Sequence, residues 1–232
     1  MKQIFMVILS VLLIFSASSM ANSSSPEEMF KKSFPNRSFE TISPTAIKGI
    51  YEIYTGNQLF YYAPDSEILI YGNIVTKEGY SLTRESFLKK MAVKMSQLPL
   101  ESALKISDGK NVIVEFIDPD CFHCRESYKF FSQRKDVTIY AFFYPLSPAS
   151  EKKIRHILCA KDQLKAYDEA MSGKLDNNAK LNVCTDKKAE DSLKLYKKLA
   201  AQIGITSTPF FYIKGQAIAG FEAPVFEQLL KN

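Results

Sequence analysis

The residues with the clearest capacity for chemistry are two cysteines, Cys121 and Cys124, which are separated by two residues. Thiols at this spacing form a reactive dithiol, a tight disulfide or half of a metal site. A zinc site would require a second ligand pair, but Cys159 and Cys184 stand alone and His156 is the only histidine outside the tetrapeptide. A purely structural disulfide would close too short a loop to stabilise the chain much. The pattern therefore predicts a redox pair, with no metal and no other cofactor.

The flanking sequence predicts which cysteine is the nucleophile. Residues 111–117 form an apolar run typical of a buried strand, and a helical pattern begins near Arg125. A cysteine between them lies at a helix N-terminus, where unpaired amides and the helix dipole lower the pKa of a thiol. We expect Cys121 to attack and Cys124 to resolve the mixed disulfide. His123 is expected to place a donor and partial positive charge beside the thiolate.

Glu115 lies within the apolar run, six residues before Cys121. A charge in a central strand is costly unless it has a function or a partner. In one interpretation Glu115 is buried, has a raised pKa and exchanges the proton of Cys124 through a water molecule. In the other, the strand is half exposed and Glu115 faces solvent.

A second informative stretch is Thr208-Pro209, which precedes an apolar run at 210–213. A proline at the start of a strand lacks a ladder donor, and an X-Pro bond adopts the cis form at low cost. The backbone of Thr208 would then offer an edge to which an extended substrate segment can pair.

Cys159 and Cys184 are the remaining partners for each other. A bridge between them closes a loop of about 25 residues and would stabilise the fold by roughly 3 kcal/mol. We interpret it as structural. A second redox pair is the alternative, although neither cysteine has a CxxC neighbour.

The first residues resemble an export signal and set the expected compartment. Lys2 is followed by an apolar run too short to span a bilayer and by small residues ending at Ala21. We expect cleavage there, a periplasmic location and an oxidising environment in which the cysteines can pair. The net charge of +5 is mild and its basic residues are scattered, which argues against nucleic acid as a partner.

The rest of the chain predicts two domains joined by a helix. Residues 22–82 contain a short helix at 25–33 and β-prone runs at 47–54, 58–62 and 68–71, which indicate a small antiparallel sheet. So small a domain buries little apolar surface, so we expect it to pair with a second copy. Its tyrosines fit such an interface: Tyr51, Tyr54, Tyr61, Tyr62 and Tyr71. The alternative is a monomeric sheet resting on the larger domain.

A linker helix is predicted within residues 83–105, and the larger domain begins at 106. Its pattern gives a strand at 111–117, a helix at 125–134 and a strand at 137–143. A long helical pattern over 150–173 and a second helix at 186–203 follow. A hairpin turning at 214–216 and a terminal helix at 224–230 complete an α+β protein.

In their order, these features resemble the thioredoxin superfamily, and within it the periplasmic disulfide isomerases of the DsbC/DsbG type. The resemblance extends over essentially the whole chain after the leader. It is carried by the N-terminal sheet and linker helix, by FIDPDC at 116–121, HILCA at 156–160, Cys184 and Thr208-Pro209.

The resemblance implies a thioredoxin-like α/β/α catalytic domain at 106–232 and a V-shaped homodimer joined through the domains at 22–82. Two catalytic sites would face a cleft that holds misfolded, disulfide-containing exported proteins. It assigns Cys121 as nucleophile, Cys124 as resolving thiol and Thr208-Pro209 as the substrate-side cis-proline loop. It further implies a structural disulfide between Cys159 and Cys184, and a membrane thiol reductant of the DsbD type.

Two residues depart from the isomerase pattern and support a second function. His123 resembles the residue found in the oxidase DsbA and in eukaryotic isomerases, and Glu115 resembles the buried acid of the oxidase and of thioredoxin. The predicted function is a thiol-disulfide isomerase. The alternatives are a dithiol oxidase and a holdase chaperone in which the thiols are secondary.

Overall fold

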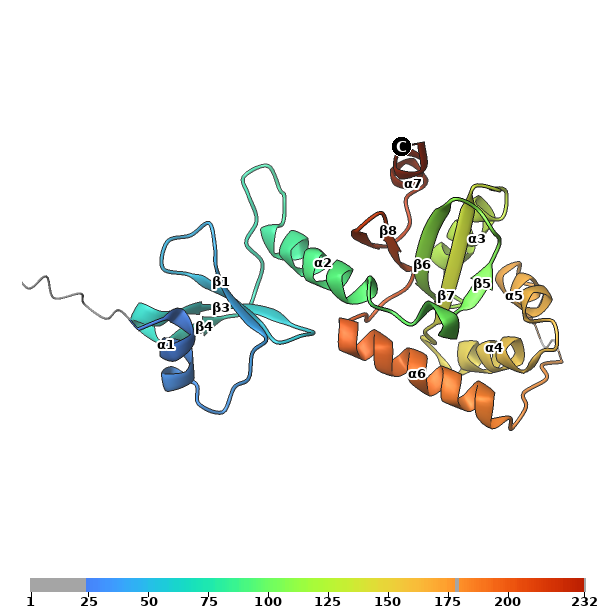
Figure 1. Ribbon diagram of the computed structural model, residues 1–232, viewed down its shortest axis with the longest axis horizontal. Coiled ribbons are helices and arrows are strands. Elements are labelled where there is room, and N and C mark those ends of the chain that lie inside the picture. The colour runs from blue at the N-terminus through green and yellow to red at the C-terminus, as the bar shows by residue number, and fades with distance from the viewer. Residues whose placement is uncertain (1–23, 178–179, 232) are drawn as a thin grey trace, which may run out of the picture.

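The computed structural model describes residues 24–177 and 180–231, so the predicted leader at 1–21 lies outside the described residues. Two sheets lie at opposite ends of an elongated molecule, and helix α2 (Leu82–Met95) runs between them (Figure 1). No helix in the described part of the chain is long and apolar enough to cross a membrane.

The N-terminal domain is a four-stranded antiparallel sheet in sequential order covered by α1 (Pro26–Ser33). Its strands are β1 (Thr41–Pro44), β2 (Tyr51–Tyr54), β3 (Leu59–Ala63) and β4 (Ile68–Ile70). Ser25 caps α1 in a reciprocal bond with Glu28, which fixes where the helix begins. The small core contains Phe30, Ile53 and Tyr62.

Three details of this domain differ from the prediction. The strand expected over 47–54 forms only at its end, because residues 47–50 make a turn in which Ile50 N–H bonds to the Ile47 carbonyl. The polar segment β1 was not predicted, and it is ordered by pairing with β2. Three of the tyrosines assigned to a dimer interface, Tyr54, Tyr61 and Tyr62, are instead buried within the monomer.

Within the predicted linker range of 83–105, the helix is α2 (Leu82–Met95). Helix α2 starts after the N-cap Ser81 and ends at Met95, since Pro99 cannot continue it. A 3₁₀ turn (Leu100–Ser102) leads into β5 (Leu104–Ile106), which pairs with the C-terminal sheet because its apolar side chains pack there.

The C-terminal sheet has five strands in the order β5-β7-β6-β8-β9. Its other strands are β6 (Asn111–Ile117), β7 (Val137–Phe143), β8 (Phe210–Ile213) and β9 (Gln216–Ala219). Only the β6–β7 pair is parallel. The central position of β6 follows from its nearly continuous apolar sequence, which is typical of a strand covered on both faces.

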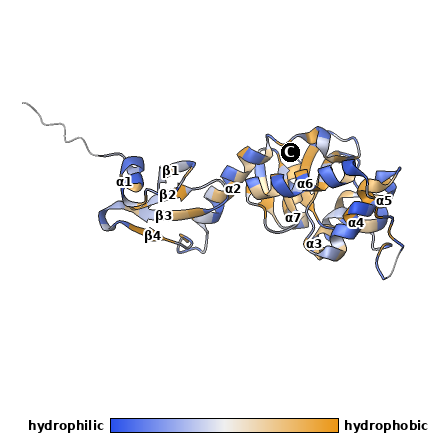
Figure 2. Ribbon diagram, turned by 90° about the horizontal axis from the view of Figure 1, so that it is seen from below, coloured by the Kyte–Doolittle hydropathy of each residue, from blue (hydrophilic) through white to orange (hydrophobic). Residues whose placement is uncertain are grey.

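In the described part of this domain the helices are α3 (Phe122–Phe131), α4 (Pro148–Cys159), α5 (Gln163–Met171), α6 (Lys187–Ile203) and α7 (Ala223–Lys231). Residues of α2, α4 and α6 share one core with Val114 and Phe116 of β6, whereas α3 and α7 pack with Ile113 on the other face. The orange strands inside and blue helix surfaces outside in Figure 2 follow this layering. The predicted α+β architecture, with a small antiparallel N-terminal sheet followed by a larger α/β domain, is confirmed.

The helix predicted over 150–173 is two helices, α4 and α5. Asp162 ends the continuity because its side chain accepts a hydrogen bond from Lys165 N–H and caps α5. Helix α3 also begins earlier than predicted, at Phe122 rather than near Arg125, so Cys124 lies in its first turn.

Candidate active site

Cys121 occupies the N-cap of α3, at the end of the turn that follows β6. Its side chain caps no backbone group, and its thiol donates a hydrogen bond to the Thr208 carbonyl oxygen at 3.3 Å. Cys124 is fully buried below it, and the Asp118 N–H donates to its sulfur at 3.5 Å. Both cysteines are free thiols, one partly exposed and one enclosed.

The surroundings of Cys121 lower the pKa of its thiol to about 5. The largest cause is the hydrogen bond from the Cys124 thiol, and burial opposes it. The Thr208 side chain and the backbone N–H groups of Cys124 and His123 add further stabilisation of the thiolate. The amides at the start of α3 therefore contribute as the sequence suggests, but the neighbouring thiol contributes more.

Burial and the bond to the Cys121 thiolate raise the pKa of Cys124 far above its ordinary value. The two thiols therefore respond oppositely to the same site. One sulfur is an accessible anion near neutral pH, whereas the other keeps its proton until a reaction removes it.

The loop before β8 lies against these sulfurs. The peptide bond between Thr208 and Pro209 is cis, and Gly220 N–H donates to the Pro209 carbonyl at 2.9 Å. The buried Thr208 hydroxyl makes no other hydrogen bond among the described residues, so it is free to donate to the sulfurs, and it lowers the pKa of both thiols. Cys121, Cys124, Thr208 and Pro209 are thus brought together from two distant parts of the chain.

Asp118 fixes the turn that presents Cys121. Its carboxylate is buried and accepts hydrogen bonds from the N–H groups of Asp120 at 2.6 Å and Leu146 at 2.5 Å. The Cys121 N–H donates to the Asp118 carbonyl at 3.1 Å. Asp118 was not among the predicted site residues, although an Asp-Pro turn just before a helix indicates such a role.

A cluster of four charged side chains also braces this turn. Arg125 donates to the Pro119 carbonyl at 2.6 Å and makes a two-pronged pair with Asp176 at 2.7 and 2.8 Å. Lys153 of α4 bonds to both Asp120 and Asp176. These cations hold the pKa of Asp176 well below its usual range. The cluster was not predicted, because its members come together only in the tertiary structure.

Glu115 is buried, with 2% of its surface exposed, so the interpretation in which it faces solvent is wrong. Burial raises its pKa to about 8, opposed by a hydrogen bond from the Tyr167 hydroxyl at 3.5 Å. Tyr167 is the hydrogen-bond partner of Glu115 within the described residues. Glu115 also lines a cavity of about 250 Å³ between α3 and α5, which has room for water.

The His123 ring does not lie where the sequence analysis expected. Its Nδ1 is 2.7 Å from Oε2 of Glu126 on the exposed side of α3. The contribution of His123 to the Cys121 thiolate comes from its backbone N–H. The group of His123 that acts on Cys121 is therefore the backbone N–H rather than the imidazole, which bonds to Glu126 in the next turn of the helix.

Two apolar side chains stand exposed beside the thiols. Phe122 is 70% exposed directly after Cys121, and Leu146 is 51% exposed on the loop joined to Asp118. Because large apolar residues so close to a reactive group remain in water, they are suited to contact another polypeptide.

The remaining cysteines form a disulfide at the far end of α4. Cys159 is the last residue of α4 and is bonded to Cys184 in the loop before α6, with a separation of 25 residues. Asn182 N–H donates to His156 Nδ1 at 2.8 Å in the same region. In the described residues, no group of three His, Cys, Asp or Glu side chains is arranged to hold a metal ion.

The arrangement as a whole is suited to thiol-disulfide exchange. It contains an accessible thiolate, a buried thiol beneath it, a polar loop opposite and a buried carboxyl whose pKa is near neutral. Attack on a disulfide sulfur requires the thiolate, and resolution of the resulting mixed disulfide by the buried thiol requires an acceptor for that thiol's proton.

Comparison with known families agrees with this chemistry. Residues 17–84 match the model of the disulfide bond isomerase protein N-terminal domain, and residues 100–232 match that of the thioredoxin-like domain.

Two curated relatives carry the name probable thiol:disulfide interchange protein DsbC. The protein from Bordetella avium is 36% identical over 61% of this chain and 52% of its own length, so the match spans about half of that relative. The protein from Bordetella pertussis is 29% identical over 82% of this chain and 68% of its own length. A crystal structure of a disulfide interchange protein from Neisseria gonorrhoeae is 25% identical, with a TM-score of 0.49, and covers 58% of this chain and 96% of that one.

Proposed function

Because this chain belongs to the thioredoxin-like domain family, with a disulfide-isomerase N-terminal domain ahead of it, we propose that it is a dimeric thiol-disulfide isomerase that rearranges incorrect disulfides in exported proteins. The observation that carries the proposal is the accessible Cys121, whose pKa is lowered to about 5 and whose thiol lies 3.3 Å from the Thr208 carbonyl.

The reaction begins at Cys121. Its thiolate attacks one sulfur of a substrate disulfide, a new S–S bond joins enzyme and substrate, and the other substrate sulfur leaves as a thiolate. A different substrate thiolate then attacks the substrate sulfur of the mixed disulfide and releases Cys121 as a thiolate. The substrate exchanges one disulfide for another, and no net oxidation or reduction occurs.

Cys124 resolves the mixed disulfide when no substrate thiol is available to do so. It attacks Cys121, the substrate leaves reduced, and the enzyme pair becomes a disulfide. The buried thiol must lose its proton in this step, and its raised pKa makes that costly. Glu115 is proposed to accept the proton through water or the Tyr167 hydroxyl, since its pKa of about 8 allows it to take up and release a proton near neutral pH.

Substrate binding is proposed to use the loop at Thr208 and Pro209 and the apolar side chains beside Cys121. An extended segment pairs with the Thr208 backbone, which holds the target disulfide in line with the thiolate. Phe122 and Leu146 then contact apolar residues that a misfolded chain leaves exposed.

The homodimer is proposed to form through the N-terminal sheet. Strand β4 is an edge strand on which Ile68 and Ile70 are exposed, and the neighbouring Tyr71 is also exposed. Figure 2 shows β4 as an apolar strand at the border of this sheet. An exposed apolar edge of this kind is stabilised by pairing with a second copy.

The proposed location is the periplasm, and the proposed reducing partner is a membrane thiol reductant of the DsbD type. An isomerase needs its nucleophile reduced, so each turnover that ends with a Cys121–Cys124 disulfide requires two electrons from such a donor.

Reactivation of a scrambled multi-disulfide protein tests this function. We expect Cys121→Ala to abolish reactivation and Cys124→Ala to retain isomerisation while accumulating mixed disulfide. The two variants are matched controls for each other, because each removes one sulfur from the start of α3. Full reactivation by Cys121→Ala would disprove the mechanism.

A dithiol oxidase is the second candidate, and the buried Glu115 together with the low pKa of Cys121 favours it. Strong stabilisation of the thiolate makes the disulfide form more oxidising. The redox state of Cys121 and Cys124 in cells, trapped by acid quenching and thiol labelling, separates the two functions. A mostly reduced pair supports the isomerase, and a mostly oxidised pair supports the oxidase.

A further inference from the structure

Helix α2 is attached to the two domains by different kinds of contact. Met91, Ala92 and Met95 are buried in the core of the C-terminal domain, together with Leu98 beyond the helix end. Burial of such apolar side chains fixes the helix firmly to that domain. Mechanically, α2 is therefore part of the catalytic domain rather than a free strut.

On its other side, α2 meets the N-terminal domain largely through polar groups. Glu52 of β2 is buried and accepts a hydrogen bond from the Ser86 hydroxyl at 2.8 Å, and Lys90 Nζ lies 3.4 Å from the same carboxylate. Lys90 also donates to the Thr41 hydroxyl at 3.2 Å. We call Glu40, Glu52, Lys90 and Lys94 the ionic seam.

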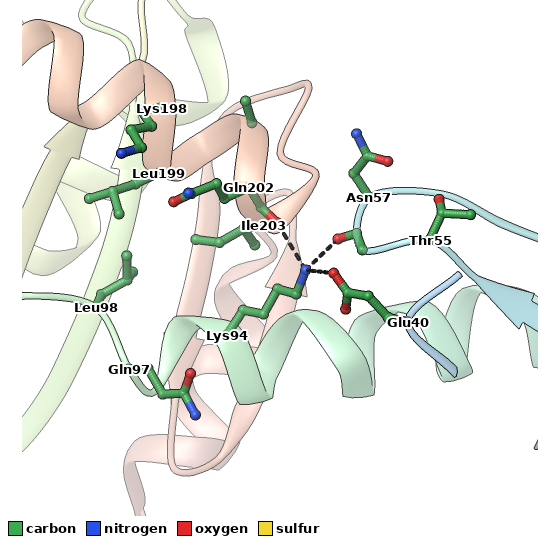
Figure 3. Close-up of a pocket in the computed structure, with 12 residues that line it drawn as sticks. Glu40, Thr55, Asn57, Lys94, Gln97, Leu98, Lys198, Leu199, Gln202 and Ile203 are labelled. Atoms are coloured by element: carbon green, nitrogen blue, oxygen red, sulfur yellow. Dashed lines mark hydrogen bonds and ion pairs between the residues drawn. The ribbon is translucent and has the colours of Figure 1, made fainter. Parts of the chain in front are cut away.

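Lys94 is the one member of the seam that reaches both domains (Figure 3). Its ammonium donates to Oε1 of Glu40 at 3.2 Å and to the Gly56 carbonyl at 2.6 Å in the N-terminal domain. Its third hydrogen bond, at 3.1 Å, goes to the Gln202 carbonyl in the last turn of α6. The last carbonyls of a helix lack intrahelical partners and carry partial negative charge, so a lysine is well placed there.

Packing around Tyr54 supplements these bonds: its ring meets the Phe87 ring edge to face at 6.2 Å, and Lys94 lies over it at 5.2 Å. Lys94 borders a solvent-open pocket of about 680 Å³ between the domains. Beside the pocket the backbones approach closely, since a Cβ on Gly204, whose φ is +94°, would lie 3.2 Å from both the Asn57 carbonyl oxygen and the Phe87 ring. Because the solvent-open pocket separates the rest of this boundary, the polar bonds of Lys94 add to the packing in holding the two domains at one angle.

We propose that Lys94, with Glu40 as its N-terminal partner, is a positioning residue that sets the orientation of the N-terminal domain relative to the catalytic domain. In the dimer, on which the proposed function rests, this orientation fixes how far apart the two Cys121 thiolates stand and how a folding substrate meets both. The chemistry at each Cys121 does not depend on Lys94.

The ionic character of the seam gives the proposal a distinctive property. Screening by salt weakens partly exposed pairs, because the Debye length falls from about 8 Å at physiological ionic strength to about 3 Å at 1 M. The Lys94 and Glu40 side chains are 26% and 50% exposed, so salt reaches this pair. A lysine that merely stabilised the fold would not change the domain orientation with salt.

The test uses the full chain and small-angle X-ray scattering at low salt and at about 1 M NaCl. We expect Lys94→Met and Glu40→Gln to change the scattering profile at low salt, and wild type to approach their profile at high salt. Lys94→Arg, which keeps charge and donors, should lie closer to wild type. Lys89→Met is the matched control, because Lys89 lies on the same helix and pairs with Glu85 of that helix at 2.6 Å.

Two activity measurements separate this inference from the proposed function. Exchange with a small disulfide should be unchanged in Lys94→Met, whereas reactivation of a scrambled protein should fall about three-fold or more. If wild type reactivates no scrambled protein, the proposed function is wrong. The scattering result still tests whether Lys94 sets the orientation of the two domains. Identical scattering of wild type, Lys94→Met and Glu40→Gln at both salt concentrations would overturn the positioning role.

Discussion

The catalytic domain contains two pairs of cysteines whose surroundings give them opposite properties. Cys121 and Cys124 meet where a strand turns into a helix, beside the Thr208 loop, and remain free thiols. Cys159 and Cys184 close a surface loop at the end of α4 and are bonded to each other. Cysteine is therefore reactive in one place and structural in the other, because only at Cys121 and Cys124 do the neighbouring groups give the two sulfurs different pKa values.

The largest expected contrast is in thiol reactivity. Since the pKa of Cys121 is about 5, its alkylation rate should stay constant down to about pH 6 and fall roughly tenfold per unit below about pH 5. Cys124 is buried with a raised pKa, so at pH 7 it should react at least about tenfold more slowly. Iodoacetamide labelling of the reduced chain with mass spectrometry measures both rates. Equal alkylation rates for Cys121 and Cys124 would contradict the difference in pKa between the two thiols.

The next largest effect is on stability and concerns the disulfide between Cys159 and Cys184. Replacing Cys159 and Cys184 with alanine removes a link across 25 residues and should lower the free energy of unfolding by roughly 3 kcal/mol. Urea denaturation of the full chain measures this loss. The pH profile of Cys121 alkylation should be unchanged. A shift in that profile would indicate that the second pair is coupled to the redox site rather than purely structural.

Glu115 should give a smaller effect that depends on pH. Burial raises its pKa from 4.5 to about 8, so the unfolded chain ionises first and the folded state loses stability as the pH rises from about 4.5 through about 8. Glu115→Gln cannot ionise, so its free energy of unfolding should be about 2 kcal/mol higher than that of wild type at pH 6, with little difference at pH 4.

Denaturation curves across pH measure the effect of Glu115→Gln. The exposed Glu227→Gln on α7 is the matched control, which should show no such trend. The single-turnover release of substrate by Cys124 should also slow in Glu115→Gln. A difference in stability that did not vary with pH would contradict an ionisable, buried Glu115.

The smallest expected effect is a change in the pKa of Cys121 when the Thr208 hydroxyl is removed. Thr208→Val removes the hydroxyl that lowers the pKa of both thiols, so the pKa of Cys121 should rise, by at most about one unit. Thiolate absorbance during pH titration measures the shift. Thr206→Val, an exposed change on the same loop, should leave the pKa of Cys121 unaltered. If the pKa of Cys121 is unchanged in Thr208→Val, then only the Cys124 thiol and the helix amides lower it.

Local sequence determined much of this protein. The CxxC spacing, the apolar run of β6, the capping residues and the Gly and Pro positions act through neighbours along the chain, so the order of elements and the two-domain architecture could be predicted from them. Element ends were predicted less well. The 3.6-residue periodicity continues through the break between α4 and α5, and the polar strand β1 has no pattern that distinguishes it from a loop.

Long-range packing decided what the sequence left open. Whether Glu115 is buried depends on Tyr167 of α5, which lies 52 residues away along the chain. The bracing of the Cys121 turn by Lys153 and Asp176, and the reach of Lys94 to both Glu40 and Gln202, likewise join separate segments. The sequence by itself determined which groups could react. Only the tertiary structure decided their pKa values and partners, because desolvation and charge contacts depend on distance in space rather than position in the chain.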